Sequence, residues 1–129
     1  MKQTPMIYVG FSANLRRLFL GVSVLFALFI IVKSLAPAVP ILSISNIDKV
    51  AHMLAYCALG AVTLPAFAHI KPLIVWCGLC VFGASIEITQ GLLSTGRSFD
   101  FLDGIANAYG ALLAVLGWRI LTWLAKKFT

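Results

Sequence analysis

Residues 72–93 read PLIVWCGLCVFGASIEITQGLL, an apolar run whose only charged side chain is Glu87. A helix needs roughly 20 residues to cross the hydrocarbon layer of a bilayer, and this run has that length. Because the backbone polar groups of a spanning segment must be satisfied within it, such a run predicts a transmembrane helix. The alternating segments of about ten residues that build a membrane barrel are absent.

Three further apolar runs have similar length: Leu18–Leu35, Val50–Ala68 and Gly104–Ala125. The chain of 129 residues is 61% hydrophobic and 11% charged, which is far too apolar for an ordinary soluble domain. We therefore predict an all-α fold, a four-helix transmembrane bundle that forms one domain at 18–125. The expected helices are about 18–35, 48–68, 72–93 and 103–125, between a basic leader at 1–17 and a basic tail at 126–129. In the last run Ala106, Gly110 and Ala114 recur every four residues, which favours close helix packing.

Ten basic residues against four acidic ones give the chain a net charge of +6, but the basic residues are spread among the predicted connections. They form no single basic patch, so we expect no nucleic-acid partner and take the lipid bilayer as the surroundings of the protein. With the N-terminus inside, seven of them fall on the cytoplasmic side: Lys2, Arg16, Arg17, Lys71, Arg119, Lys126 and Lys127. Lys33, Lys49 and Arg97 fall outside. This asymmetry predicts that both termini are cytoplasmic in a bacterial inner membrane.

All four acidic residues lie near one predicted end of this bundle, which the same orientation places at the outer face. They are Asp48, Glu87, Asp100 and Asp103, and their polar companions are Lys49, His52, Tyr56, Gln90, Arg97 and Asn107. Spacings of three or four residues put members of this set on one face of each helix. A carboxylate inside a membrane segment is costly, so Glu87 in particular indicates a functional site. We expect these ten residues to form a binding site.

The residue types allow more than one chemistry. A histidine with carboxylates can hold a divalent metal, so His52, Glu87 and Asp103 are candidate metal ligands and candidate catalytic groups. Lys49 and Arg97 could receive a phosphate while His52 or Glu87 acts as general acid or base. Asp48, Asp100 and Asp103 could instead only cap helix N-termini or complement their dipoles. No cofactor is required by any motif.

Three segments together resemble the VanZ-like family of small bacterial membrane proteins. They are D-K-x-x-H at 48–52, E-x-x-Q at 87–90 and G-R-x-x-D-x-x-D-x-x-x-N at 96–107, and the similarity covers roughly residues 46–117. The resemblance implies a multi-helix membrane protein, and it implies a possible link to resistance against teicoplanin-type glycopeptides, with which the namesake of the family is associated. It assigns no reaction to the chain.

Three functions therefore stay open. The first is a membrane protein whose outer polar site binds an anionic lipid, a lipid-linked phosphate or a cell-wall precursor. The second is a membrane-embedded enzyme, metal-dependent or general-base, that acts on a lipid-linked phosphate. The third is a purely structural bundle whose polar network sets the register of the helices.

Overall fold

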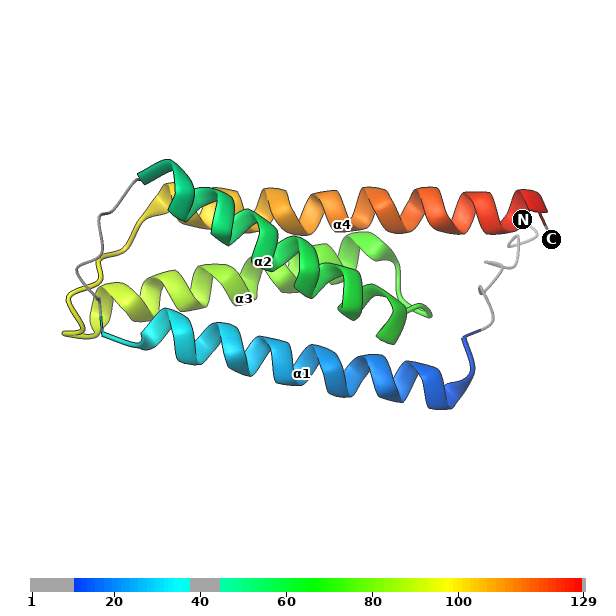
Figure 1. Cartoon of the computed structure of the whole chain (residues 1–129), viewed down its shortest axis with the longest axis horizontal. Helices are drawn as coiled ribbons and strands as arrows, with labels where there is room; N and C mark the ends of the chain where they lie inside the picture. The colour runs from blue at the N-terminus through cyan, green and yellow to red at the C-terminus, as the bar shows by residue number, and fades with distance from the viewer. Residues whose placement is uncertain (1–10, 38–44, 129) are drawn as a thin grey trace.

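The computed structural model describes residues 11–37 and 45–128, and these form four helices and no strand. The helices are α1 (Ala13–Leu35), α2 (Ser45–Ala66), α3 (Pro72–Leu92) and α4 (Phe101–Phe128) (Figure 1). All four are long and apolar enough to span a membrane. The predicted all-α, four-helix fold is confirmed.

The observed helix ends differ from the predicted ones by up to five residues. Helix α1 begins at Ala13, where the hydroxyl of Ser12 accepts a hydrogen bond of 3.2 Å from the Leu15 N–H. The predicted start at 18 was wrong because Arg16 and Arg17 continue a helix as readily as most residues do. Helix α2 begins three residues before the predicted 48 and ends two residues before the predicted 68, just after Pro65. Helix α4 is longer at both ends than the predicted 103–125.

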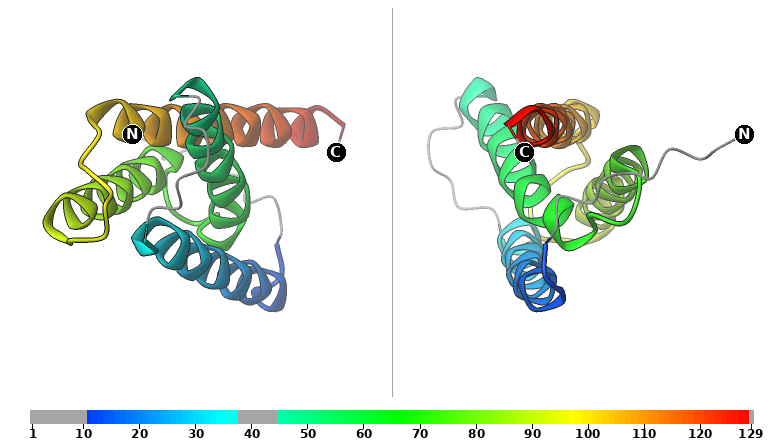
Figure 2. Two further views of the ribbon diagram at one scale, coloured as in Figure 1. Left: turned by 60° about the vertical axis from the view of Figure 1, so that its left-hand side comes forward. Right: turned by 90° about the vertical axis from the view of Figure 1, so that its right-hand side faces the viewer.

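Helix α2 is the central element of the bundle. It packs against each of the other three helices, most extensively against α4, whereas α1 and α4 do not pack together in the described residues (Figure 2). The contact between α2 and α4 depends on small residues. A Cβ atom added at Gly60 would lie 2.6 Å from the Cβ of Ala114, and one added at Gly110 would collide with the main chain of Met53. The close packing predicted from the small-residue spacing on α4 is therefore observed.

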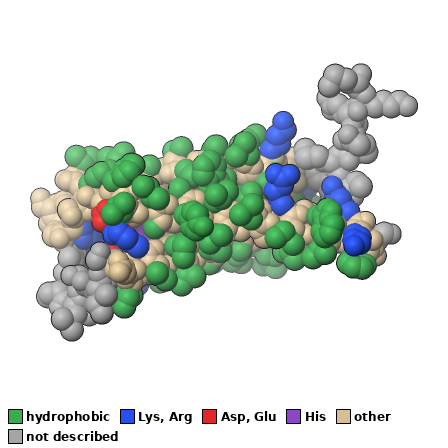
Figure 3. Space-filling model, turned by 90° about the horizontal axis from the view of Figure 1, so that it is seen from above, with side chains coloured by type: hydrophobic (Ala, Val, Ile, Leu, Met, Phe, Trp, Pro, Cys, Tyr) green, Lys and Arg blue, Asp and Glu red, His purple; other side chains and the backbone are tan. Residues whose placement is uncertain are grey.

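The surface of the bundle divides along its length into three zones. Apolar side chains cover the middle, as expected for a surface in contact with lipid, and many of them are more than half exposed, such as Leu25 at 70% and Val81 at 70% (Figure 3). Acidic and basic side chains gather at the end where α1 and α3 finish and α2 and α4 begin, which we call the polar end. The opposite end, which we call the basic end, carries Lys126 and Lys127, and there Arg16 lies 3.2 Å from the His69 ring.

Candidate functional site

The polar end collects the ten predicted site residues from three helices and one loop. Asp48, Lys49, His52 and Tyr56 lie on α2, Glu87 and Gln90 on α3, Arg97 and Asp100 in the loop before α4, and Asp103 and Asn107 on α4. Asp48 and Asp103 are in the first turns of their helices, where the helix dipole favours an anion. The sequence placed these residues near one end of the bundle, and the structure brings several of them into direct side-chain contact.

His52 is at the centre of these contacts. Its Nδ1 lies 3.0 Å from the Oδ1 of Asn107. An amide oxygen only accepts, so Nδ1 carries the hydrogen and donates it to Asn107. In the neutral ring the Nε2 lone pair then faces two carboxylates, with Asp103 Oδ2 at 3.7 Å and Asp48 Oδ2 at 4.0 Å. Asn107 therefore sets both the orientation and the tautomer of the histidine.

Lys49 joins the loop carboxylate to the helix carboxylate. Its Nζ is 3.2 Å from Asp100 Oδ2 and 3.3 Å from Asp103 Oδ1. The other oxygen of Asp100 accepts a hydrogen bond of 2.8 Å from the Leu102 N–H, which caps the start of α4. This main-chain bond, and after it the Lys49 ammonium, hold the pKa of the Asp100 carboxyl below its usual value. Asp100 thus both caps a helix and belongs to the polar cluster.

Glu87 and Tyr56 are among the most deeply buried polar groups of the cluster, with 1% and 2% of their surface exposed. Among the described residues, neither carboxylate oxygen of Glu87 nor the hydroxyl of Tyr56 has a hydrogen-bond partner. The Nδ1 of His52 is 4.0 Å from Glu87, and the main-chain N–H of Asp100 faces the carboxyl group short of hydrogen-bond geometry. Buried polar groups in folded proteins are usually paired, so these two are the strongest sign of a ligand.

Gln90 and Arg97 have a structural role that the sequence did not reveal. The Gln90 side-chain amide donates a hydrogen bond of 2.7 Å to the carbonyl of Ser34, and the Arg97 Nε donates one of 3.1 Å to the carbonyl of Ala36. Carbonyl groups at the carboxyl end of a helix have no partner within the helix. These two side chains therefore attach the end of α1 to α3 and to the loop that follows it.

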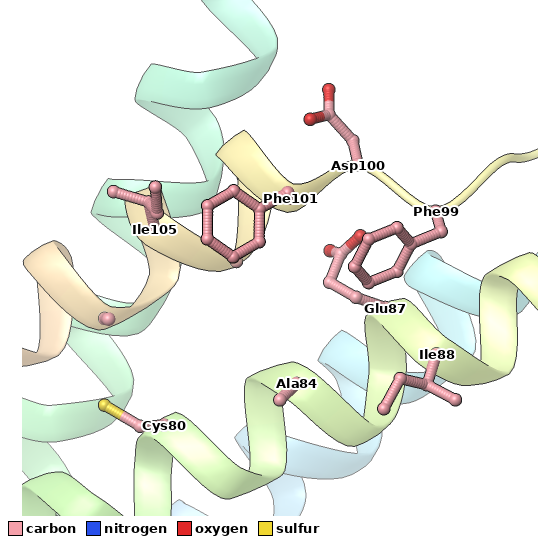
Figure 4. Close-up of a pocket in the computed structure, with 10 residues that line it drawn as sticks. Cys80, Ala84, Glu87, Ile88, Phe99, Asp100, Phe101 and Ile105 are labelled. Carbon is pink, nitrogen blue, oxygen red and sulfur yellow. The ribbon is translucent and has the colours of Figure 1, made fainter.

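Two cavities flank the cluster, and Glu87 lines both of them. A polar cavity of about 230 Å³ lies between α1 and α2, and its charged or polar lining includes Lys33, Asp48, His52, Tyr56, Arg97 and Asn107. A second cavity of about 340 Å³ lies between α3 and α4 and is mostly apolar (Figure 4). Sequence reasoning missed Lys33, although this cation stands alone at the polar end of the first apolar run. It also missed Gly83, where an added Cβ would lie 3.2 Å from the Tyr56 ring.

The geometry changes the predicted set of metal ligands. Asp48, His52 and Asp103 each offer one ligand atom, and these atoms all lie within 4.8 Å of one another. The prediction had Glu87 in place of Asp48. Glu87 approaches Nδ1 of His52, the nitrogen that Asn107 already uses, whereas Asp48 and Asp103 face Nε2. A histidine nitrogen with two carboxylate oxygens is a reasonable donor set for a divalent cation, and at such sites the other ring N–H usually donates a hydrogen bond, as it does here to Asn107.

The comparisons with known proteins agree with the family resemblance seen in the sequence. No curated protein and no solved structure matches the chain. A sequence model of the VanZ/LLP1 family matches residues 13–122, a range that includes the three motifs, most of all four helices and every residue of the polar cluster. The chain therefore belongs to the VanZ/LLP1 family of membrane proteins.

Proposed function

We propose that this protein binds the phosphate-bearing head group of an envelope lipid or lipid-linked cell-wall precursor in the polar cavity between α1 and α2. The observation that carries the proposal is that the two cations Lys33 and Arg97 line this cavity together with the hydroxyl of Tyr56, which has no hydrogen-bond partner in the described part of the chain. Phosphate oxygens accept hydrogen bonds from guanidinium, ammonium and hydroxyl groups, and bonds to charged groups are the stronger ones.

The mixture of charges around the cavity favours a head group over simple attraction to an anionic surface. A patch of cations alone would attract any acidic lipid. Here the carboxylates of Asp48 and Glu87 line the same cavity. A phosphate bound to Lys33 and Arg97 would therefore leave the rest of the head group facing hydrogen-bond acceptors. This arrangement suits a ligand that carries hydrogen-bond donors, such as sugar hydroxyls or an amine, beside its phosphate. The excess of basic residues at the basic end supports an orientation with the cavity facing outward from the inner membrane.

Native mass spectrometry of detergent-extracted protein tests the proposal. Lys33→Met should reduce the retained phospholipid or lipid-linked phosphate by about tenfold, because it removes one charge-assisted contact. Lys71→Met is the matched control, since Lys71 is an exposed lysine outside the cavity, before α3. Arg97→Lys should restore only part of the retention that Arg97→Ala loses, because the planar fork of the guanidinium is missing. Equal retention in Lys33→Met and Lys71→Met would remove the basis of the proposal.

A second candidate function is a membrane-embedded enzyme that uses a divalent metal, or His52 as a general base, on a lipid-linked phosphate. The specific observation in its favour is the grouping of Asp48, His52 and Asp103 around the Nε2 of the histidine. A divalent metal held there would polarise a phosphoryl oxygen. Without a metal, the same Nε2 could accept a proton from an attacking hydroxyl.

Binding of Mn²⁺, followed by electron paramagnetic resonance, separates this candidate from the first. His52→Ala should abolish binding, and Asn107→Ala should weaken it about 10- to 100-fold because the histidine loses its orienting partner. Asp100→Asn is the matched control, since this carboxylate lies outside the group of three. If Mn²⁺ affinity is unchanged in His52→Ala, the metal-dependent form of this candidate is excluded.

A purely structural role for the cluster is the remaining alternative. In that case every polar substitution at the polar end would lower the yield of folded protein in proportion to the loss of any activity, because buried partners would be left unsatisfied. The link to glycopeptide susceptibility is tested in cells, by comparing the teicoplanin sensitivity of a deletion strain complemented with wild-type protein or with Lys33→Met.

A further inference from the structure

The cavity between α3 and α4 is a groove with apolar walls. Its walls are formed by Cys80, Ala84 and Ile88 on α3 and by Gly104, Ile105 and Ala108 on α4 (Figure 4). Several side chains around it are half exposed or more, among them Ile88 at 54% and Phe101 at 69%, so the groove borders the apolar surface that faces the bilayer.

The depth of the groove corresponds to one leaflet of a membrane. Its α3 wall extends from Cys80 to Ile88, and the eight steps between these residues span about 12 Å along a helix. Half of a hydrocarbon layer of roughly 30 Å is about 15 Å. Near the deep end, the Trp76 indole N–H donates a hydrogen bond of 2.9 Å to the carbonyl of Ala108 and joins the two helices. A lipid chain of the adjacent leaflet is the partner that lies alongside such a groove along its length.

Glu87 supplies the polar end of the groove. Its carboxyl group is aimed between Phe99 and the main chain at Asp100, at the end of the groove nearest the loop. It is 1% exposed, and neither of its oxygens has a hydrogen-bond partner among the described residues. A neutral O–H group is the least costly donor to bring to this depth, because moving an ammonium group out of water carries a much larger penalty.

From these observations we infer that the groove between α3 and α4 binds one acyl chain of a lipid from the adjacent leaflet, with a free hydroxyl next to that chain donating to Glu87. The site shares Glu87 with the polar cavity between α1 and α2, but it opens between α3 and α4 and involves neither Lys33 nor Arg97. It goes beyond the phosphate-binding proposal and does not depend on it.

Quenching of Trp76 fluorescence tests the inference. Trp118 and Trp123 are replaced by Phe, which leaves Trp76 beside the deep end of the groove as the only tryptophan. The probes are a long-chain alcohol with a terminal bromine and its methyl ether, which keeps the chain and the oxygen but has no O–H. We expect saturable quenching by the alcohol in detergent-solubilised protein and a half-saturating concentration about tenfold higher for the ether.

Three variants assign the binding to the groove. A Cβ atom added at Gly104 would meet no described residue within 4 Å, and Gly104 lines the groove, so the side chain of Gly104→Leu should fill the groove and abolish the saturable quenching. Gly117→Leu is the matched control on the same helix, because a Cβ atom at Gly117 would also meet no described residue within 4 Å but lies outside the groove, and it should leave the quenching unchanged. Glu87→Leu should make the alcohol and the ether equivalent.

Two results would overturn the inference. One is equal quenching of Trp76 in Gly104→Leu and Gly117→Leu, and the other is equal affinity of the wild-type protein for the alcohol and the ether. Ala84→Phe fills the same space from α3 and gives an independent block if Gly104→Leu does not fold. Lys33→Met and Arg97→Ala, which test the phosphate proposal, should not change the quenching, so failure of one proposal is distinguishable from failure of the other.

Discussion

Asp100 shows how one side chain can serve both helix formation and charge pairing. One of its oxygens accepts from the Leu102 N–H at 2.8 Å, and the other lies 3.2 Å from Lys49. Both contacts favour the ionised carboxyl group and keep its pKa below the usual value. The stabilisation that they provide therefore depends on pH, because it requires the charged form.

The direction of this dependence follows from linkage. A depressed pKa in the folded state means that the stabilisation is complete above the unfolded value of about 4 and is lost as the pH falls through the lower folded pKa. We expect Asp100→Asn to melt below the wild type at about pH 6, since Asn keeps the cap but loses the charge. The difference in Tm should shrink as the pH is lowered to about 3. A difference that stays constant over this range would contradict the ionic contribution of Asp100.

At the scale of the element, the effect of replacing a glycine of α4 on stability depends on what that glycine faces. Gly110 faces the main chain of Met53 on α2, whereas a Cβ atom at Gly117 would meet no described residue within 4 Å. The same substitution should therefore have opposite effects at the two positions. Adding a methyl group at Gly110 forces the two backbones apart, and overpacking of this kind typically costs about 1–3 kcal/mol. At Gly117 it should stabilise the helix by up to about 1 kcal/mol, because alanine favours helix more than glycine does.

Thermal unfolding in detergent provides the measurement for this pair. Gly110→Ala is expected to have a lower Tm than the wild type, and Gly117→Ala an equal or higher one. Because the two variants have the same composition and lie on the same helix, a shared shift would reflect helix propensity alone. Lower stability in both, or in neither, would mean that the α2–α4 contact does not depend on the absence of a side chain at Gly110.

At the scale of the whole molecule, the orientation of the bundle in the membrane decides which ligands can reach the polar end. The seven-to-three distribution of basic residues predicts that this end faces outward. Ser94 is exposed in the α3–α4 connection and Lys71 is exposed before α3. In a background without Cys57, Cys77 and Cys80, Ser94→Cys should react with an impermeant maleimide in intact cells. Lys71→Cys should react only after permeabilisation, and the reverse pattern would place the site in the cytoplasm.

The sequence predicted the number of helices and the residues of the polar cluster because both depend on local patterns. Four apolar runs of spanning length require four helices, and the i, i+4 spacing of Asp48 and His52 puts both on one helix face. Lys33, Gly83 and the bonds from Gln90 and Arg97 to α1 could not be predicted in this way. Each of them depends on where α1 or α3 lies against its neighbours, which no spacing within a single helix encodes.

The pairing between α2 and α4 has a consequence for the biosynthesis of the protein. Lys49 and His52 are made 51–55 residues before their partners Asp100, Asp103 and Asn107. At a translation rate of about 5–20 residues per second, roughly 3–11 s pass between the synthesis of these α2 residues and that of their partners. During that time the Lys49 ammonium lacks both of its carboxylate partners and the His52 imidazole lacks Asn107 and Asp103, and both groups are costly in lipid. The nascent α2 therefore has to remain beside the insertion machinery or near the water interface until α4 arrives, so the step that completes the site is also the step that completes insertion.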